Sequence, residues 1–182
     1  LMSITYLFII GGIVVAYLIF MFGIRNLLVK KTQGVVTDCT AEEAMSNYLQ
    51  QILQGFNPKD FQLVWGSTFA NTDITRVFAY NDSQILVIPC KLLNGELVMP
   101  ENQPSAAINL ADVNHMHIGR KETIMRMPFV TLFFDAEDND NNFDLWREKK
   151  DVCGNNNHAA FQKFIDFMEN WAKEHNIPVE EI

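Results

Sequence analysis

The chain has 182 residues, of which 48% are apolar and 20% charged, with 14 Lys and Arg against 22 Asp and Glu. This length suits one domain of ordinary size with a small additional element, and the apolar content excludes wholesale disorder. The net charge of −8 argues against a nucleic-acid partner, because phosphate contacts need a basic surface. Three cysteines (Cys39, Cys90 and Cys153) are too few for a disulfide scaffold, and we expect reduced thiols.

The first 24 residues contain no charged side chain, and residues 4–24 form an almost unbroken apolar run. As a helix, this run would extend about 31 Å, the thickness of the hydrocarbon core of a bilayer. A cleaved signal peptide is the alternative, but no Lys or Arg precedes the run. The sequence therefore predicts a transmembrane helix over 1–24, a juxtamembrane linker over 25–40 and a soluble domain over 41–182.

Three cations, Arg25, Lys30 and Lys31, follow the apolar run. Lys and Arg beside a span stay on the cytoplasmic side, so we expect a single-pass protein of the cell membrane with a cytosolic C-terminal domain. Gly12 and Ala16 have the small-xxx-small spacing that lets two helices approach closely, which leaves open a homo-oligomer formed through the span. Beyond residue 31, 11 Lys and Arg remain against all 22 Asp and Glu, a net charge of −11.

The soluble part is expected to begin with an amphipathic helix. Thr40 and Glu43 fit a capping box, in which each side chain accepts a hydrogen bond from the backbone N–H of the other residue. Apolar residues then recur at helical spacing up to Gly55, which can end the helix. These residues are Ala41, Met45, Tyr48, Leu49, Ile52 and Leu53.

Short runs typical of β-strands follow from Phe61 to Phe134. Asn94-Gly95, between two of these runs, is the strongest short signal for a hairpin. Closely spaced strands with tight turns predict an antiparallel meander. The expected strands are 61–65, 75–80, 84–90, 96–99, 106–110, 115–119 and 123–134, the last interrupted at Pro128.

A polar stretch over 135–157 is expected to be a loop, with most of its acidic residues toward its start. Asn157 could then cap a final helix, and Pro178 closes the chain soon after that helix. Its residues at helical spacing make one broad apolar stripe, which predicts packing against the sheet. The stripe consists of Phe161, Phe164, Ile165, Met168, Trp171 and Ala172.

An antiparallel meander closed by a C-terminal amphipathic helix resembles the bacterial pleckstrin-homology-like (PH-like) domain. The resemblance is carried by residues 85–90 and 107–119, in which Ile108, Leu110, Asp112 and Val113 occupy an apolar-x-Leu-x-Asp-Val pattern. It covers residues 75–175, and the chain departs from it in the helix at 41–53 and the insertion at 135–157. The fold class that it implies is α+β: an N-terminal transmembrane helix followed by an antiparallel PH-like β-barrel closed by the C-terminal helix. It also implies a non-catalytic binding or scaffolding module.

Metal ligation has two weak sets of candidates. His115 and His117 share one face of an expected strand, a spacing able to chelate a metal ion. Asp138 and Asp140 lie in the acidic run, which lacks the leading Asp and central Gly of an EF-hand. Solvent-facing histidines and a solvated acidic loop are the simpler interpretations. No nucleophile elbow, Walker loop or dinucleotide fingerprint occurs, so we expect no cofactor and no enzyme.

The sequence thus favours a membrane-anchored, non-catalytic scaffold whose cytosolic PH-like domain recognises a protein partner. Two alternatives remain open: a structural accessory subunit of a larger membrane complex, and a membrane-tethered metal-dependent enzyme. The acidic soluble part should repel anionic headgroups, so we expect contact with the bilayer through residues 4–24. We expect the polypeptide partner to present Lys or Arg to the acidic surface.

Overall fold

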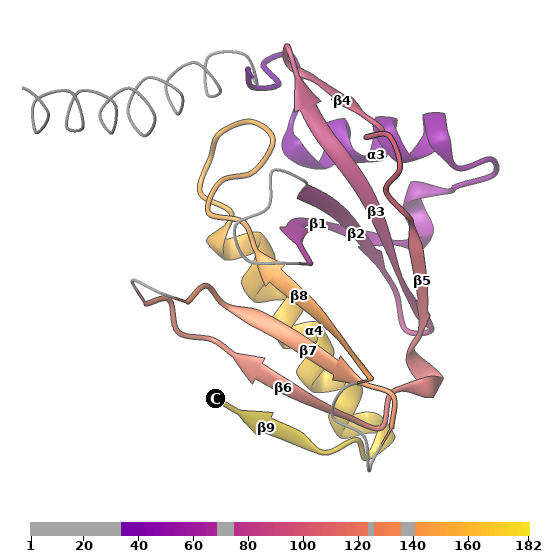
Figure 1. Ribbon diagram of the computed structural model, residues 1–182, viewed down its shortest axis with the longest axis vertical. Coiled ribbons are helices and arrows are strands. Elements are labelled where there is room, and N and C mark those ends of the chain that lie inside the picture. The colour runs from indigo at the N-terminus through magenta and orange to yellow at the C-terminus, as the bar shows by residue number, and fades with distance from the viewer. Residues whose placement is uncertain (1–33, 69–74, 124–125, 136–140) are drawn as a thin grey trace, which may run out of the picture.

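The computed structural model describes residues 34–68, 75–123, 126–135 and 141–182. A nine-stranded sheet runs through this part, in the order β4-β3-β2-β1-β8-β7-β6-β9, with β5 paired to β3 (Figure 1). One half of the sheet contains β1 (Gln62–Ser67), β2 (Thr75–Tyr80), β3 (Gln84–Leu93), β4 (Glu96–Val98) and β5 (Ala106–Asn109). The other half contains β6 (His115–Gly119), β7 (Phe129–Phe133), β8 (Asn142–Arg147) and β9 (Val179–Glu181). The helices are α3 (Ala41–Ile52) and α4 (His158–His175), with short 3₁₀ turns at η2 (Pro58–Asp60) and η3 (Leu110–Asp112).

The two halves of the sheet meet where β1 pairs with β8. Among the described residues, two residue pairs form this junction, Gly66 with Arg147 and Ser67 with Trp146. A Cβ atom on Gly66 would lie 2.4 Å from the ring of Phe78 and 2.6 Å from the carbonyl oxygen of Trp146. The close approach of the halves therefore requires glycine at this position.

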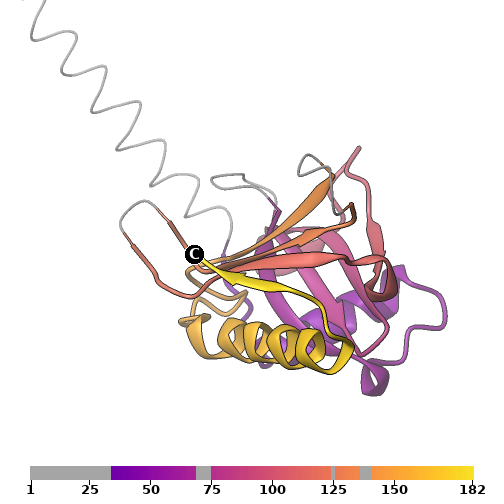
Figure 2. The ribbon, with the colours of Figure 1, turned by 90° about the horizontal axis from the view of Figure 1, so that it is seen from below.

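Helix α4 packs on one face of both halves (Figure 2). Its predicted apolar stripe is confirmed, because the same six residues are the buried ones of the helix. They contact alternate residues of the strands, such as Val64 on β1, Phe78 on β2 and Leu132 on β7. This period of two is what a pleated strand with one face on a core produces. The main core thus lies between α4 and the sheet.

Helix α3 packs on the opposite face of the first half only. The residues that alternate with the α4-facing ones, including Trp65, Val77 and Ile88, form a second core with the helix. The predicted capping box is confirmed: Glu43 N–H donates to Thr40 Oγ1 at 3.2 Å, and Thr40 N–H donates to Glu43 Oε2 at 2.8 Å. In the second core, the Tyr48 hydroxyl donates to the carbonyl oxygen of Pro89 at 2.6 Å.

Local signals located most of the strands correctly. The expected strands at 75–80 and 115–119 are confirmed with those bounds, and the Asn94-Gly95 hairpin joins β3 to β4 with positive φ angles of 52° and 85°. Strand β7 begins directly after Pro128, which has no N–H for a ladder. The prediction of a loop throughout 135–157 is wrong, because β8 lies within it. This strand was hidden because polar Asn142 and Asp144 alternate with its buried residues.

The predicted antiparallel PH-like barrel is also wrong, although the fold is rich in sheet as expected. The sheet is mixed, because β9 runs parallel to β6. It is also open, because β4 and β9, the strands at its two ends, do not pair with each other. The chain leaves α4 through Asn176, a C-cap residue with φ of 57°, and then passes Pro178. Helix α4 thereby serves as the crossover that a parallel neighbour requires. Neither a PH-like nor a bacterial assignment follows from this architecture.

No helix among the described residues is long and apolar enough to cross a membrane. The predicted transmembrane helix over 1–24, with Gly12 and Ala16, and the flanking Arg25, Lys30 and Lys31 lie outside the described residues. The membrane part of the expected fold class, and the single-pass localisation derived from it, therefore have no structural support and are withdrawn. They rested on the length and composition of the apolar run and on the cations that follow it.

Candidate functional site

The two histidines proposed as metal ligands pack against an aromatic ring. They lie on β6, on the face turned away from α4. The imidazole of His115 stacks on the ring of Phe133, with centroids 4.2 Å apart and planes 6° apart, and His117 lies 4.5 Å from the same ring. In addition, His117 Nε2 lies 3.2 Å from an oxygen of Glu180. The described residues contain no group of three or more His, Cys, Asp or Glu that could hold a metal ion, and Asp138 and Asp140 fall outside them.

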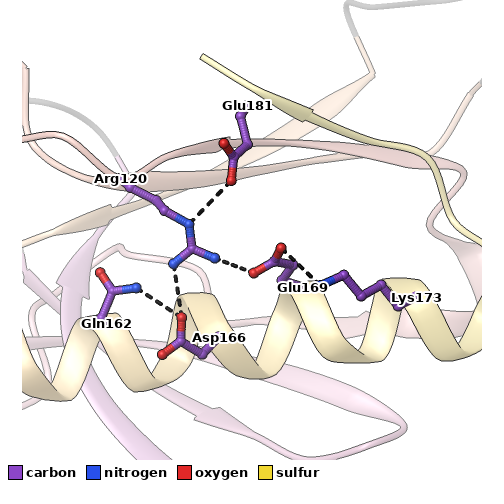
Figure 3. Close-up of polar contacts among 6 residues, drawn as sticks. All are labelled: Arg120, Gln162, Asp166, Glu169, Lys173 and Glu181. Carbon is purple, nitrogen blue, oxygen red and sulfur yellow. Dashed lines mark hydrogen bonds and ion pairs between the residues drawn. The ribbon is translucent and has the colours of Figure 1, made fainter.

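A network of ion pairs surrounds Arg120, the residue directly after β6 (Figure 3). Its Nη1 lies 2.9 Å from Asp166 Oδ1, and its Nε lies 3.5 Å from Glu181 Oε1. Its Nη2 forms a third ion pair, with Glu169. Glu169 also pairs with Lys173 at 3.2 Å. One guanidinium thus ties β6 to both α4 and β9.

The network shifts the pKa values of Arg120 and Asp166. Partial burial by itself would lower the pKa of Arg120, but the hydrogen bonds and charges of the surrounding carboxylates outweigh it and raise the pKa. The pKa of Asp166 is lowered, first by the hydrogen bond from Arg120 and then by one from the Gln162 amide at 2.9 Å. Both groups are therefore held in their charged forms. Through its contact with Glu181, Arg120 links β9 to α4.

Strand β9 is an edge of the sheet (Figure 1). Toward β6, the carbonyl oxygen of Pro178 accepts from Met116 N–H, and Ile182 N–H donates to the carbonyl oxygen of Ile118, both at 3.0 Å. Because backbone groups alternate in direction along a strand, Val179 and Glu181 turn their N–H and C=O groups away from β6. Those groups have no partner strand in the described part of the chain. They form a free hydrogen-bonding edge.

The side chains beside this edge are acidic and exposed. Those of Glu180 and Glu181 have relative exposures of 70% and 69%. They point to opposite faces of the sheet, since Glu180 meets His117 and Glu181 meets Arg120. We call Val179–Glu181 with these two carboxylates the β9 edge. A strand added to the β9 edge would find a carboxylate on each of its faces.

Sequence reasoning missed both β9 and the Arg120 network. The sequence indicated no role for Arg120, because its partners Asp166 and Glu169 lie 46 and 49 residues further along the chain. The spacing of Asp166, Glu169 and Lys173 on one helix face was the available signal for a charged cluster. It does not indicate which strand faces that cluster.

Comparisons with known proteins give no family. No protein-family model matches the chain, and no curated protein matches it. Among solved structures, it is similar to the hSac2 domain from the human phosphoinositide phosphatase Sac2, with 12% identity over 80% of this chain and 92% of that chain, at a TM-score of 0.46. A likeness at this level assigns neither a fold nor an activity to the chain. Our prediction that this chain is not an enzyme rested on missing sequence motifs, which do not exclude an enzyme, and it is withdrawn.

Proposed function

We propose that this chain is a protein-binding domain whose β9 edge accepts an extended, basic segment of a partner protein. The observation that carries the proposal is the free hydrogen-bonding edge at Val179 and Glu181, flanked by exposed carboxylates. An extended peptide can add a strand to such an edge, because its own N–H and C=O groups complete the ladder. The backbone then supplies affinity, and the side chains supply selectivity.

Charge favours a basic segment. The part of the chain beyond residue 31 carries a net charge of −11, which attracts basic partners during diffusion. At the β9 edge itself, Lys or Arg side chains of an added strand would lie directly opposite Glu180 and Glu181. Opposite charges across neighbouring strands contribute roughly 0.2–1 kcal/mol per pair. An acidic segment would be repelled at the same positions.

The Arg120 network supports the proposal because it helps to order β9 before a partner binds. Short edge strands, which pair on one side only, tend to fray. Here Glu181 is paired with Arg120, which α4 holds through Asp166 and Glu169. Because β9 is already ordered, binding a partner strand costs less conformational entropy.

The test uses three synthetic peptides and the full chain. The first repeats the unit Lys-Lys-Thr-Thr over twelve residues, so that lysines lie on both faces of the strand. The second has Glu in place of Lys, and the third is the first with every amide N-methylated. We expect saturable calorimetric binding of the first peptide only, with the largest amide shifts in NMR spectra at Val179 and Glu181. The N-methylated peptide is the matched control, because it keeps the charges and loses the ladder.

The variant Glu180→Lys leaves the Glu181–Arg120 contact in place, and it should weaken binding of the Lys peptide and strengthen binding of the Glu peptide. Equal binding of the Lys peptide with and without N-methylation would reduce the contact to nonspecific attraction. Shifts confined to a site away from β9 would contradict the proposed edge.

A further inference from the structure

A cavity of about 240 Å³ lies between β5 of the first half of the sheet and β8 of the second half. Its lining includes Arg76 from β2, Ala106 from β5 and Phe143 from β8. These elements are distant from the β9 edge in the order of strands. The cavity therefore requires an account separate from the partner-binding proposal.

The guanidinium of Arg76 is buried beside this cavity and has no carboxylate partner in the described part of the chain. The residue is only 8% exposed. Its Nε donates to Thr68 Oγ1 at 2.7 Å and its Nη1 to the carbonyl oxygen of Pro104 at 3.3 Å, and both acceptors are neutral. Among the described residues, no carboxylate lies within ion-pair distance of Arg76. The other deeply buried arginine, Arg147, is paired with Glu122.

Part of the hydrogen-bonding capacity of Arg76 is unused among the described residues. A guanidinium has five N–H groups, and the two bonds above use two of them. Its Nη2 atom has no partner in the described part of the chain. There, Arg147 Nε is the only side-chain nitrogen or oxygen that is both sealed from solvent and unpartnered, so Nη2 of Arg76 remains accessible. Since Arg76 lines the cavity, these free donors are available to a ligand inside it.

Electrostatics favour an anion at this position. Burial lowers the pKa of Arg76, which shows that its cationic form is poorly solvated. An arginine nevertheless stays protonated in a protein. A carboxylate that binds the free donors would supply the missing countercharge, and a guanidinium–carboxylate contact of this kind is strong when desolvated.

The remaining walls limit the size and charge of the ligand. Val87, Ala106 and Phe143 provide apolar surface, and the volume is below the roughly 300–1,000 Å³ typical of drug-sized ligand sites. Asp144 also lines the cavity, and its Oδ1 accepts from the Thr131 hydroxyl at 2.6 Å. One cation with a carboxylate nearby suits a monoanion better than a dianionic phosphate.

We propose that this cavity binds a small monocarboxylate, with the carboxylate on the guanidinium of Arg76 and a short apolar tail against Phe143 and Ala106. The site is distinct from the β9 edge, and either can exist without the other.

The test compares probes of matched length on the full chain. Hexanoate, hexanol and hexyl phosphate share one tail and differ in the head group. We expect saturable calorimetric binding of hexanoate, with at least tenfold weaker binding of the other two. The Nε–H signal of Arg76 should shift in NMR spectra during the hexanoate titration. Equal binding of hexanol would show that the tail alone is recognised and would overturn the proposal, as would tighter binding of hexyl phosphate.

Two variants locate the site. Arg76→Lys keeps the charge but loses the planar donor array, and it should weaken hexanoate binding at least tenfold. Because a buried arginine can be needed for folding, Ala106→Met is the second variant: it fills the cavity without touching Arg76. Unchanged hexanoate binding by a folded Ala106→Met protein would overturn the proposal.

The sequence around Arg76 offers one alternative source of a countercharge, Asp73, which a variant can test. It lies three residues before Arg76 in the sequence and outside the described residues. If its carboxylate neutralised Arg76, the unaltered chain would not bind hexanoate and the Asp73→Asn variant would. That result would overturn the proposal, whereas equal binding by the two proteins supports it.

Discussion

Helices α3 and α4 cover opposite faces of the sheet, and they differ in whether they pack on one half of it or on both. The core under α4 contains residues from both halves, from Val64 on β1 to Leu145 on β8 and Val179 on β9. The core under α3 contains strand residues only from the first half, together with the adjoining segments around Val36 and Val152. Because the halves share only two ladder pairs among the described residues, α4 joins them and α3 stabilises one of them. The helix whose position matters most to the fold is the one that spans the junction.

The substitution with the largest expected effect on stability is Phe164→Ala on α4. The Phe164 ring is fully buried, and its centroid lies 4.8 Å from that of Tyr80 and 5.5 Å from that of Phe161. Removing it leaves a cavity in the core that α4 forms with the sheet, so we expect the free energy of unfolding to fall by about 3–5 kcal/mol. Denaturant unfolding monitored by circular dichroism measures this loss. A fall below about 1 kcal/mol would mean that the core rearranges around the gap and that α4 does not control the junction.

The matched change on the other side is Leu49→Ala on α3. Leu49 has no exposed surface, so the substitution should cost about 2–4 kcal/mol. Hydrogen exchange should show the faster opening in α3 and the first half, while amides of β6 and β7 keep their protection. Equal acceleration across β6 and β7 would show that the two cores are one cooperative unit, contrary to the comparison.

The parts that sequence predicted correctly are those fixed by local patterns. Both helices have the expected stripes because their apolar residues repeat at helical spacing over three or more turns. Thr40 with Glu43 and Asn94-Gly95 encode a cap and a turn within a few residues. Such features depend on sequence neighbours, which a single sequence shows.

The features that sequence did not predict depend on contacts between distant residues. Asn157 is the N-cap residue of α4 as expected, but its side chain makes no cap and donates instead to the carbonyl oxygen of Trp65 at 2.6 Å, 92 residues away. Strand β9 is defined by its parallel pairing with β6, which the sequence of three residues does not reveal. The candidate site was missed for the same reason, since Arg120 meets its carboxylates only in space, and the histidines chosen in its place pack on Phe133.

The smallest expected effect concerns the helix starts, where the helices also differ. Helix α4 has no side-chain cap, whereas α3 begins with the capping box of Thr40 and Glu43. Hydrogen bonds from the backbone and the hydroxyl of Thr40 lower the pKa of Glu43. A carboxyl whose pKa is lower in the folded state contributes stability that is fully present above its unfolded pKa and is lost as pH falls through the folded pKa. The cap of α3 should therefore weaken on acidification, and the start of α4 has no such capping carboxylate.

Glu43→Gln separates this effect from every other titration in the protein. The amide oxygen of Gln can still accept from Thr40 N–H, as it does in other capping boxes, but the side chain does not titrate. The two proteins share all remaining groups, so the difference in their free energies of unfolding reports Glu43 alone. Between about pH 6 and pH 3, we expect the unaltered chain to lose stability relative to the variant, with the change concentrated below the ordinary pKa of a glutamate. Equilibrium unfolding at several pH values measures the difference. A difference that stays constant with pH, or that changes in the opposite direction, would mean that the carboxylate does not hold the start of α3, and the helix would then depend on packing alone, as α4 does.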